Sequence, residues 1–104
     1  MHAVRNLFAD AEPPPQGETF ETLCSRAGTR IERIVSSAAP DPVRYDQAED
    51  EWVALLRGEA ELEIEGEPVV LRPGDSLLLP AHTRHSVTRV SSGAVWLAVH
   101  AARR

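Results

Sequence analysis

Short runs of alternating apolar and polar residues make up most of this chain after residue 17. The clearest run covers residues 59–65, where glutamate occupies every odd position and Ala60, Leu62 and Ile64 lie between. Residues two apart on a strand project to the same face, so this run predicts a strand with its acids toward water and its apolar side chains inward. Further segments of strand character cover residues 19–24, 30–36, 51–57, 69–71, 76–79, 85–90 and 94–100.

Turn-forming residues separate these segments. Gly58 marks a bend between two of them, and Pro73-Gly74 suits a type II turn because glycine accepts the positive φ at the second corner. Other turn signals are Arg26-Ala27-Gly28, Glu65-Gly66-Glu67 and Ser91-Ser92-Gly93. Many short strands without a long helical pattern predict an all-β fold, an antiparallel sandwich or barrel.

The first 17 residues follow a different pattern. Val4, Leu7, Phe8 and Ala11 have helical spacing, but the three prolines 13–15 lack amide donors and stop any helix. We therefore expect an N-terminal arm or short helix over residues 1–17 and a single domain over residues 18–104.

Composition and charge narrow the function classes. The net charge of −5 argues against a phosphate-tracking surface, so nucleic acid is not an expected partner. Cys24 is the single cysteine, which excludes an internal disulfide, and its default interpretation is a buried or half-buried small hydrophobe. No apolar run approaches the roughly 20 residues that cross a bilayer, and the first twelve residues lack the pattern of a secretion signal. We expect a cytoplasmic protein without a membrane partner.

Two glycine-anchored motifs carry a family resemblance. In the first, Glu51 is followed by six residues and then Gly58; in the second, Gly74 is followed by five residues and Pro80, and His85 comes five positions later. This combination resembles the cupin superfamily, in particular its small single-domain members. The resemblance implies a small jelly-roll β-barrel around a pocket that often holds a metal, and a homodimer formed through the sheets.

The resemblance also identifies candidate metal ligands. Metal-binding cupins carry two histidines one residue apart, a glutamate four residues after the second, and a third histidine in the second motif. The matching positions here hold Tyr45, Gln47, Glu51 and His85. The first three share strand parity, so they are expected to project into one pocket with His85. Gln47 can offer a carbonyl oxygen, and either His82 or His100 could supply the missing imidazole.

The predicted ligand set is therefore Gln47, Glu51, His85 and His100. Such mixed nitrogen and oxygen donors suit one divalent metal such as iron, manganese, nickel or zinc. Tyr45 and His82 are the candidates for moving a proton or donating a hydrogen bond to a substrate. The alternative is a polar pocket without tightly bound metal, in which Glu51 pairs with an arginine such as Arg89.

The two tryptophans are expected to differ. Trp52 has the opposite parity to Glu51, so it should point outward, where an intersubunit or sheet-to-sheet contact is favoured. Trp96 lies among apolar residues and is expected in packing.

Two functions follow from these residues. The first is binding of a small polar molecule in the barrel by a metal-dependent enzyme of the dioxygenase, isomerase or lyase type. The second is a non-catalytic module that binds or senses a metabolite without tightly bound metal.

Overall fold

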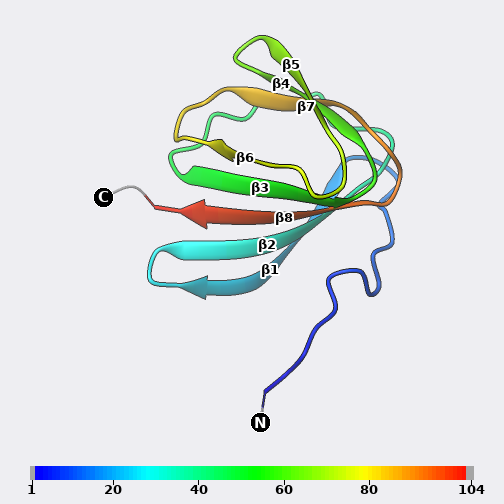
Figure 1. The fold of residues 1–104 in the computed structure, drawn as a ribbon, viewed down its shortest axis with the longest axis vertical. Helices are drawn as coiled ribbons and strands as arrows, with labels where there is room; N and C mark the ends of the chain where they lie inside the picture. The colour runs from blue at the N-terminus through cyan, green and yellow to red at the C-terminus, as the bar shows by residue number, and fades with distance from the viewer. Residues whose placement is uncertain (1, 103–104) are drawn as a thin grey trace.

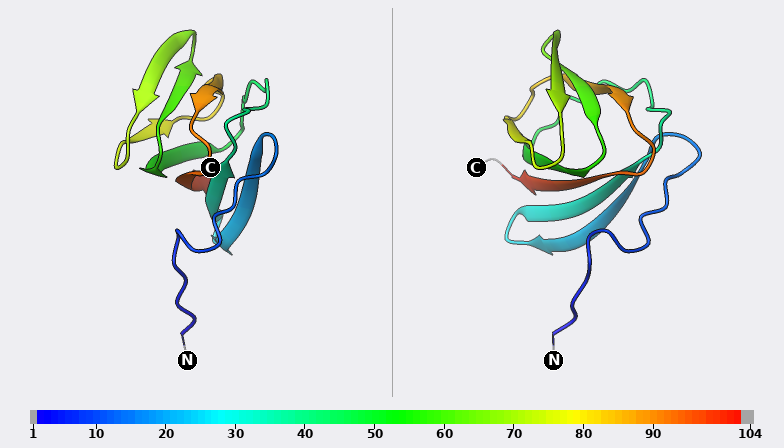
Figure 2. Two further views of the ribbon diagram at one scale, coloured as in Figure 1. Left: turned by 90° about the vertical axis from the view of Figure 1, so that its right-hand side faces the viewer. Right: turned by 45° about the vertical axis from the view of Figure 1, so that its right-hand side comes forward.

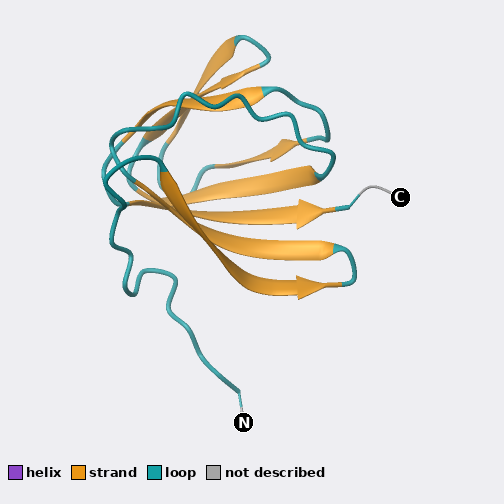
Figure 3. Cartoon of the chain, turned by 180° about the vertical axis from the view of Figure 1, so that it is seen from behind, coloured by secondary structure: helices purple, strands orange, loops and turns teal. Residues whose placement is uncertain are grey.

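The computed structural model describes residues 2–102, and these contain eight strands and no helix (Figure 3). Every segment of predicted strand character forms a strand. The strands are β1 Glu18–Arg26, β2 Thr29–Ser36, β3 Asp50–Arg57, β4 Ala60–Ile64, β5 Glu67–Leu71, β6 Ser76–Leu79, β7 His85–Val90 and β8 Ala94–Ala101.

The strands form two antiparallel sheets that enclose the core (Figure 1). One sheet has the order β1-β2-β8-β3-β6 and the other the order β5-β4-β7. Figure 2 shows the smaller sheet curling over the half of the larger sheet that contains β3 and β6, while β1 and β2 extend the larger sheet beyond it. The predicted small jelly-roll barrel is confirmed.

The core lies where the inward faces of the two sheets meet. Leu55 of β3 is fully buried, and Leu62 of β4 and Trp96 of β8 are 3 % exposed. On β4 the apolar residues point inward and the acids outward, as the alternation predicts. The outward position of Trp52 is also confirmed, since it is 39 % exposed.

The segment before β1 is an arm tied to the outer surface of the large sheet. Its residues 7–10 form only a turn, so the helical alternative is wrong. Arg33 of β2 donates to the backbone carbonyls of Leu7, Ala9 and Asp10, and the guanidinium of Arg57 lies 4.6 Å from the ring centre of Phe8. Arg33 thus occupies backbone carbonyls of the arm, and Arg57 holds the Phe8 ring.

Two further expectations can be compared with the fold. Cys24 is exposed on β1, so the prediction of a buried or half-buried thiol is wrong. The strand irregularity between Thr22 and Cys24 accompanies this outward position. Strand β1 begins at Glu18, the first residue of the predicted domain, whereas the outer limits of the predicted division, residues 1 and 104, lie outside the described residues. No helix that could cross a membrane occurs in residues 2–102.

Candidate functional site

A cavity opens between the two sheets and combines an apolar wall with one group of polar side chains. The polar members are Glu18, Tyr45, Gln47, Glu51, His85 and His100. The apolar members are Phe20, Ile34, Val53, Leu62, Leu79, Val87 and Trp96. A concave apolar site with a few convergent polar groups is the usual form of a small-molecule site.

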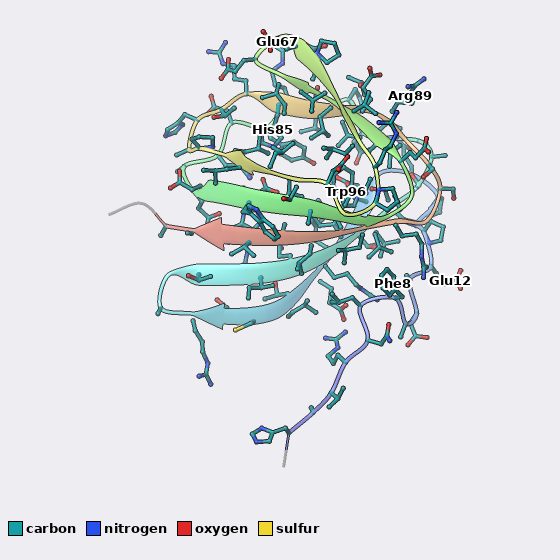
Figure 4. All side chains as sticks on the ribbon, viewed as in Figure 1. Phe8, Glu12, Glu67, His85, Arg89 and Trp96 are labelled. Carbon is teal, nitrogen blue, oxygen red and sulfur yellow. The ribbon has the colours of Figure 1, made fainter. Side chains whose placement is uncertain are left out.

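Strand parity brings the two motif residues Glu51 and His85 together. On β3, Glu51 and Val53 face the cavity and Trp52 faces outward. His85 is the first residue of β7, on the opposite sheet, and Figure 4 shows its side chain inside the barrel with that of Trp96. The Nε2 atom of His85 lies 3.7 Å from Oε1 of Glu51, and both side chains are buried.

The surroundings of His85 fix its tautomer. Its Nδ1 lies 2.9 Å from the carbonyl oxygen of Thr83, and a carbonyl can only accept, so Nδ1 carries a proton. In the neutral ring, Nε2 then presents a lone pair toward Glu51 and the cavity. The ring of Tyr45 stacks on His85 at a centroid distance of 5.4 Å, and the backbones of the two residues exchange two hydrogen bonds.

Gln47 links this pair to the cavity wall. Its Nε2 donates to Oε1 of Glu51 at 3.1 Å. Its own Oε1 is buried and has no hydrogen-bond partner among the described residues. A buried carbonyl oxygen without a donor is costly, so this atom favours a ligand that brings a donor or a cation.

Glu18 is a cavity residue that the sequence motifs did not indicate. Its carboxylate accepts a hydrogen bond of 2.9 Å from the hydroxyl of Ser36, which in turn accepts one of 2.9 Å from the indole N–H of Trp96. Burial raises the pKa of Glu18; the Ser36 bond opposes this rise, and the nearby charge of Glu51 adds to it. Position 18 shares parity with Phe20, another lining residue, but nothing in the sequence singled out this acid.

Tyr45 is also affected by the acids around it. Burial raises the pKa of its phenol, and the charges of Glu18, Asp41 and Glu51 raise it further. The phenol therefore keeps its proton at neutral pH, which makes it a hydrogen-bond donor and a poor metal ligand.

His82, in contrast, does not reach the cavity. It has a φ of 62°, its side chain is 70 % exposed, and its Nδ1 lies 2.8 Å from Oδ1 of Asp46. The backbone N–H of His82 bonds to the carbonyl of Gln47 at 2.6 Å, which holds residue 82 at the rim. The prediction that His82 serves pocket chemistry, as a ligand or a proton carrier, is not supported by this position.

His100 lines the cavity but faces other carboxylates. Its Nε2 is 2.8 Å from Oε1 of Glu32, at an angle too poor for a hydrogen bond, and its Nδ1 is 3.8 Å from Oε1 of Glu49. Arg30 forms two hydrogen bonds with Glu49. We interpret this as an electrostatic cluster beside Glu51, which lies opposite His100 in register and lines the same cavity. The alternative pairing of Glu51 with Arg89 is wrong, since Arg89 lies near Glu61 on the outside.

The donors around Glu51 limit what cation could bind. Glu51 and His85 are common metal ligands, and Gln47 adds its unpaired carbonyl oxygen. Residues 2–102 contain no group of three or more histidine, cysteine, aspartate or glutamate side chains placed to hold a metal ion. One imidazole, one carboxylate and one neutral amide oxygen would leave part of the shell of a divalent cation to solvent or to a ligand.

Glu18→Gln is expected to stabilise the protein at neutral pH. Because burial raises the folded-state pKa of Glu18 above its ordinary 4.5, the stability linked to its proton is present below that value and is lost as pH rises through the folded-state pKa. The variant should melt a few degrees above wild type at about pH 7.5 and no higher than wild type at about pH 4. For a domain of this size, roughly 1 kcal/mol of stability corresponds to 4–8 °C in melting temperature.

Circular dichroism melts at both pH values measure this difference. The control is Glu67→Gln, an exposed acid on β5 that should change neither melt. A melting temperature of Glu18→Gln above that of wild type only at about pH 4 would contradict this prediction.

Comparison with known proteins adds family relationships to this geometry. Residues 32–100 match the family model of the cupin domain (Cupin_2). A crystal structure from Ralstonia eutropha, named a "putative mannose-6-phosphate isomerase", is 44% identical, covers 98% of this chain and 100% of its own, and has a TM-score of 0.87. Among the curated proteins the comparison returns no match.

More distant structures support the fold alone. A conserved Streptococcus pyogenes protein of unknown function is 21% identical, with 100% of this chain and 90% of that chain covered and a TM-score of 0.84. An RmlC-like cupin protein from Desulfovibrio desulfuricans is 19% identical, with 97% of each chain covered and a TM-score of 0.82.

Proposed function

Because this chain belongs to the cupin family, we propose that it binds a small organic molecule in the cavity of its barrel without a tightly held metal. The observation that carries the proposal is the unpaired, buried Oε1 of Gln47, which belongs to the polar group of a cavity whose remaining wall is apolar. A bound molecule would satisfy that oxygen and cover the apolar wall at the same time.

The polar group offers a ligand both donors and acceptors. The phenol of Tyr45 donates, whereas Oε1 of Gln47, the carboxylate of Glu51 and Nε2 of neutral His85 accept. Stacking of Tyr45 on His85 and the Gln47–Glu51 bond hold these groups in place before a ligand arrives. Such preorganisation lowers the entropy cost of binding.

A metal-assisted enzyme is the second candidate, and one observation favours it. The lone pair of His85 Nε2 and the Glu51 carboxylate lie 3.7 Å apart, and Gln47, bonded to Glu51 through its amide nitrogen, adds an unpaired oxygen, which together could serve as ligands of iron, manganese, nickel or zinc. A bound divalent ion would polarise a substrate oxygen. Tyr45, which keeps its proton, would donate a hydrogen bond to that oxygen. The Ralstonia eutropha protein is named as an isomerase, which is a further reason to test metals.

A ligand panel with a cavity-filling variant tests both candidates. The panel contains mannose, mannose 6-phosphate, n-butylammonium, manganese chloride and zinc chloride, each titrated by calorimetry and thermal shift. Val87→Trp fills the cavity from β7, and Val70→Trp adds the same ring to the outside of β5. We expect at least one organic compound to stabilise the wild type by about 2.7 kcal/mol at a hundred times its Kd, to act equally on Val70→Trp, and not to act on Val87→Trp.

The outcomes separate the two candidates. Binding of one metal ion per chain at micromolar concentration, lost in His85→Ala, would favour the enzyme over the metal-free module. If no organic compound of the panel binds the wild type in a manner that Val87→Trp abolishes, the proposed binding function is wrong.

We also propose that the protein pairs as a homodimer through the outer face of its large sheet. A row of apolar residues crosses all five strands of that face, each opposite the next in register. Its members are Cys24, Ile31, Val99, Trp52 and Leu78. Trp52 and Leu78 are 39 % and 60 % exposed in the single chain. Exposed apolar residues in a continuous row, with a tryptophan among them, are typical of an interface.

Trp52→Glu is expected to weaken this dimer at least tenfold, because a carboxylate would be buried against apolar side chains. Sedimentation equilibrium across a concentration series measures the dissociation constant. Val70→Glu places the same charge on an exposed valine of the other sheet and should leave it unchanged. A wild type that stays monomeric at high concentration would rule out the dimer.

A further inference from the structure

We infer that the ligand of the barrel is a small organic cation, an ammonium with apolar substituents whose charge lies between Glu18 and Glu51. This inference rests on the proposed binding function and names the chemical class that the cavity selects. It depends on three features of the lining that residues 2–102 provide: two carboxylates, no basic side chain other than histidine, and an aromatic wall.

The two carboxylates enter the cavity from different strands of the large sheet. Glu18 comes from the start of β1 and Glu51 from β3, and both line the same space. Each receives one hydrogen bond from a neutral side chain, Ser36 to Glu18 and Gln47 to Glu51. A single neutral donor leaves most of the acceptor capacity of a carboxylate unused.

No cationic side chain within residues 2–102 neutralises Glu18. It forms no ion pair with any residue in 2–102, and the described cavity lining contains neither arginine nor lysine. The nearby arginines are engaged elsewhere: Arg30 with Glu49, and Arg33 with Glu21 and the arm on the outer face. A protonated His85 would pair with Glu51, which lies 3.7 Å away, and would still leave Glu18 without a partner.

The two carboxylates line one buried space. Burial raises the pKa of Glu18, the Ser36 hydrogen bond opposes this rise, and the charges of Glu51 and Asp41 add to it. Two carboxylates that share one cavity repel a further negative charge. A ligand with a positive charge relieves that repulsion, whereas a phosphate or carboxylate would add to it.

The rest of the wall suits an apolar, cationic ligand. Phe20, Tyr45 and Trp96 contribute aromatic rings, and an ammonium group near such rings gains cation–π attraction. Aliphatic side chains of β3, β4, β6 and β7 complete the wall and would pack against the substituents. An inorganic cation makes no use of this apolar surface.

Three probes of equal size and different charge test the inference. Butylammonium, butanol and butyrate share one four-carbon chain and differ in the head group. Titrations at about pH 7.5 are followed by two-dimensional NMR, with the indole N–H of Trp96 as the reporter, because it bonds to Ser36, the donor to Glu18. The indole of outward-facing Trp52 is the internal control.

We expect butylammonium to bind at least tenfold more tightly than butanol, and butyrate to bind most weakly. Glu18→Gln should lower the butylammonium affinity about tenfold and change the butanol affinity less than twofold. Glu51→Gln should act in the same direction, so the test does not depend on one variant folding. Glu67→Gln makes the same charge change on an exposed residue and should have no effect.

Each alternative result overturns the inference. Butanol or butyrate binding as tightly as butylammonium would exclude charge selection, and so would an ammonium preference unchanged in both Glu18→Gln and Glu51→Gln. If butylammonium fails to bind while another panel compound binds in a manner that Val87→Trp abolishes, the cationic class is wrong and the binding function stands. If no compound binds, both fail.

Discussion

Gly58→Ala is expected to destabilise the protein by about 2–5 kcal/mol, the sum of a backbone and a packing cost. Gly58 has a φ of +89°, which disfavours any side chain. A Cβ there would lie 2.6 Å from Oγ of Ser91 and 2.9 Å from Cβ of buried Ala94. It would also displace the Ser91 hydroxyl that accepts the backbone N–H of Glu59 at 3.0 Å.

Gly66→Ala provides a matched control for this prediction. Gly66 has a similar φ of +82°, but a Cβ there meets nothing within 4 Å. It should therefore lose only the backbone contribution of about 1–2 kcal/mol. Urea unfolding at equilibrium gives the free energy of unfolding of both variants. Equal losses of stability in the two variants would mean that the contacts of Gly58 with Ser91 and Ala94 can relax. Glycine would then be required at position 58 for its backbone conformation alone.

Ser36→Ala should have the second largest effect, about 1–3 kcal/mol, because it leaves a buried donor unpaired. The Ser36 side chain is fully buried, and its hydroxyl connects the Trp96 indole to Glu18 through two hydrogen bonds of 2.9 Å. Without the hydroxyl, the indole N–H has no partner and the pKa of Glu18 loses the one contact that lowers it. The melting temperature should fall by roughly 4–8 °C for each kcal/mol.

A double-mutant cycle isolates the Ser36–Glu18 contact. Ser36→Ala, Glu18→Gln and the double variant are compared by urea unfolding, with Ser76→Ala on an exposed position of β6 as the control. Residues in direct contact typically show a coupling energy of about 0.5–3 kcal/mol. Additive effects would mean that the hydroxyl supports Trp96 alone and has no influence on the cavity carboxylate.

The sequence determined the strands and the meeting of the two motif residues. Alternation is a local property, and it assigned the acids of β4 to the outside before any packing was known. The resemblance to cupins implied that Glu51 points inward, and alternation then placed Trp52 on the outer face. The turn residues, Gly58 and Pro73-Gly74 among them, marked where each strand ends. These local signals agree with one another, which is why an antiparallel sandwich or barrel could be predicted from them, while the resemblance to cupins implied the jelly-roll barrel.

The tertiary structure alone decided which other groups join the cavity. Glu18 enters it because β1 pairs with β2, at the edge of the sheet and 33 positions before Glu51 in the chain. His82 is excluded although it is near His85 in sequence, since a rim turn with a positive φ has no strand parity to direct its side chain. Periodicity gives the face of a residue within its own strand, whereas its neighbours across the cavity depend on the order and packing of the sheets.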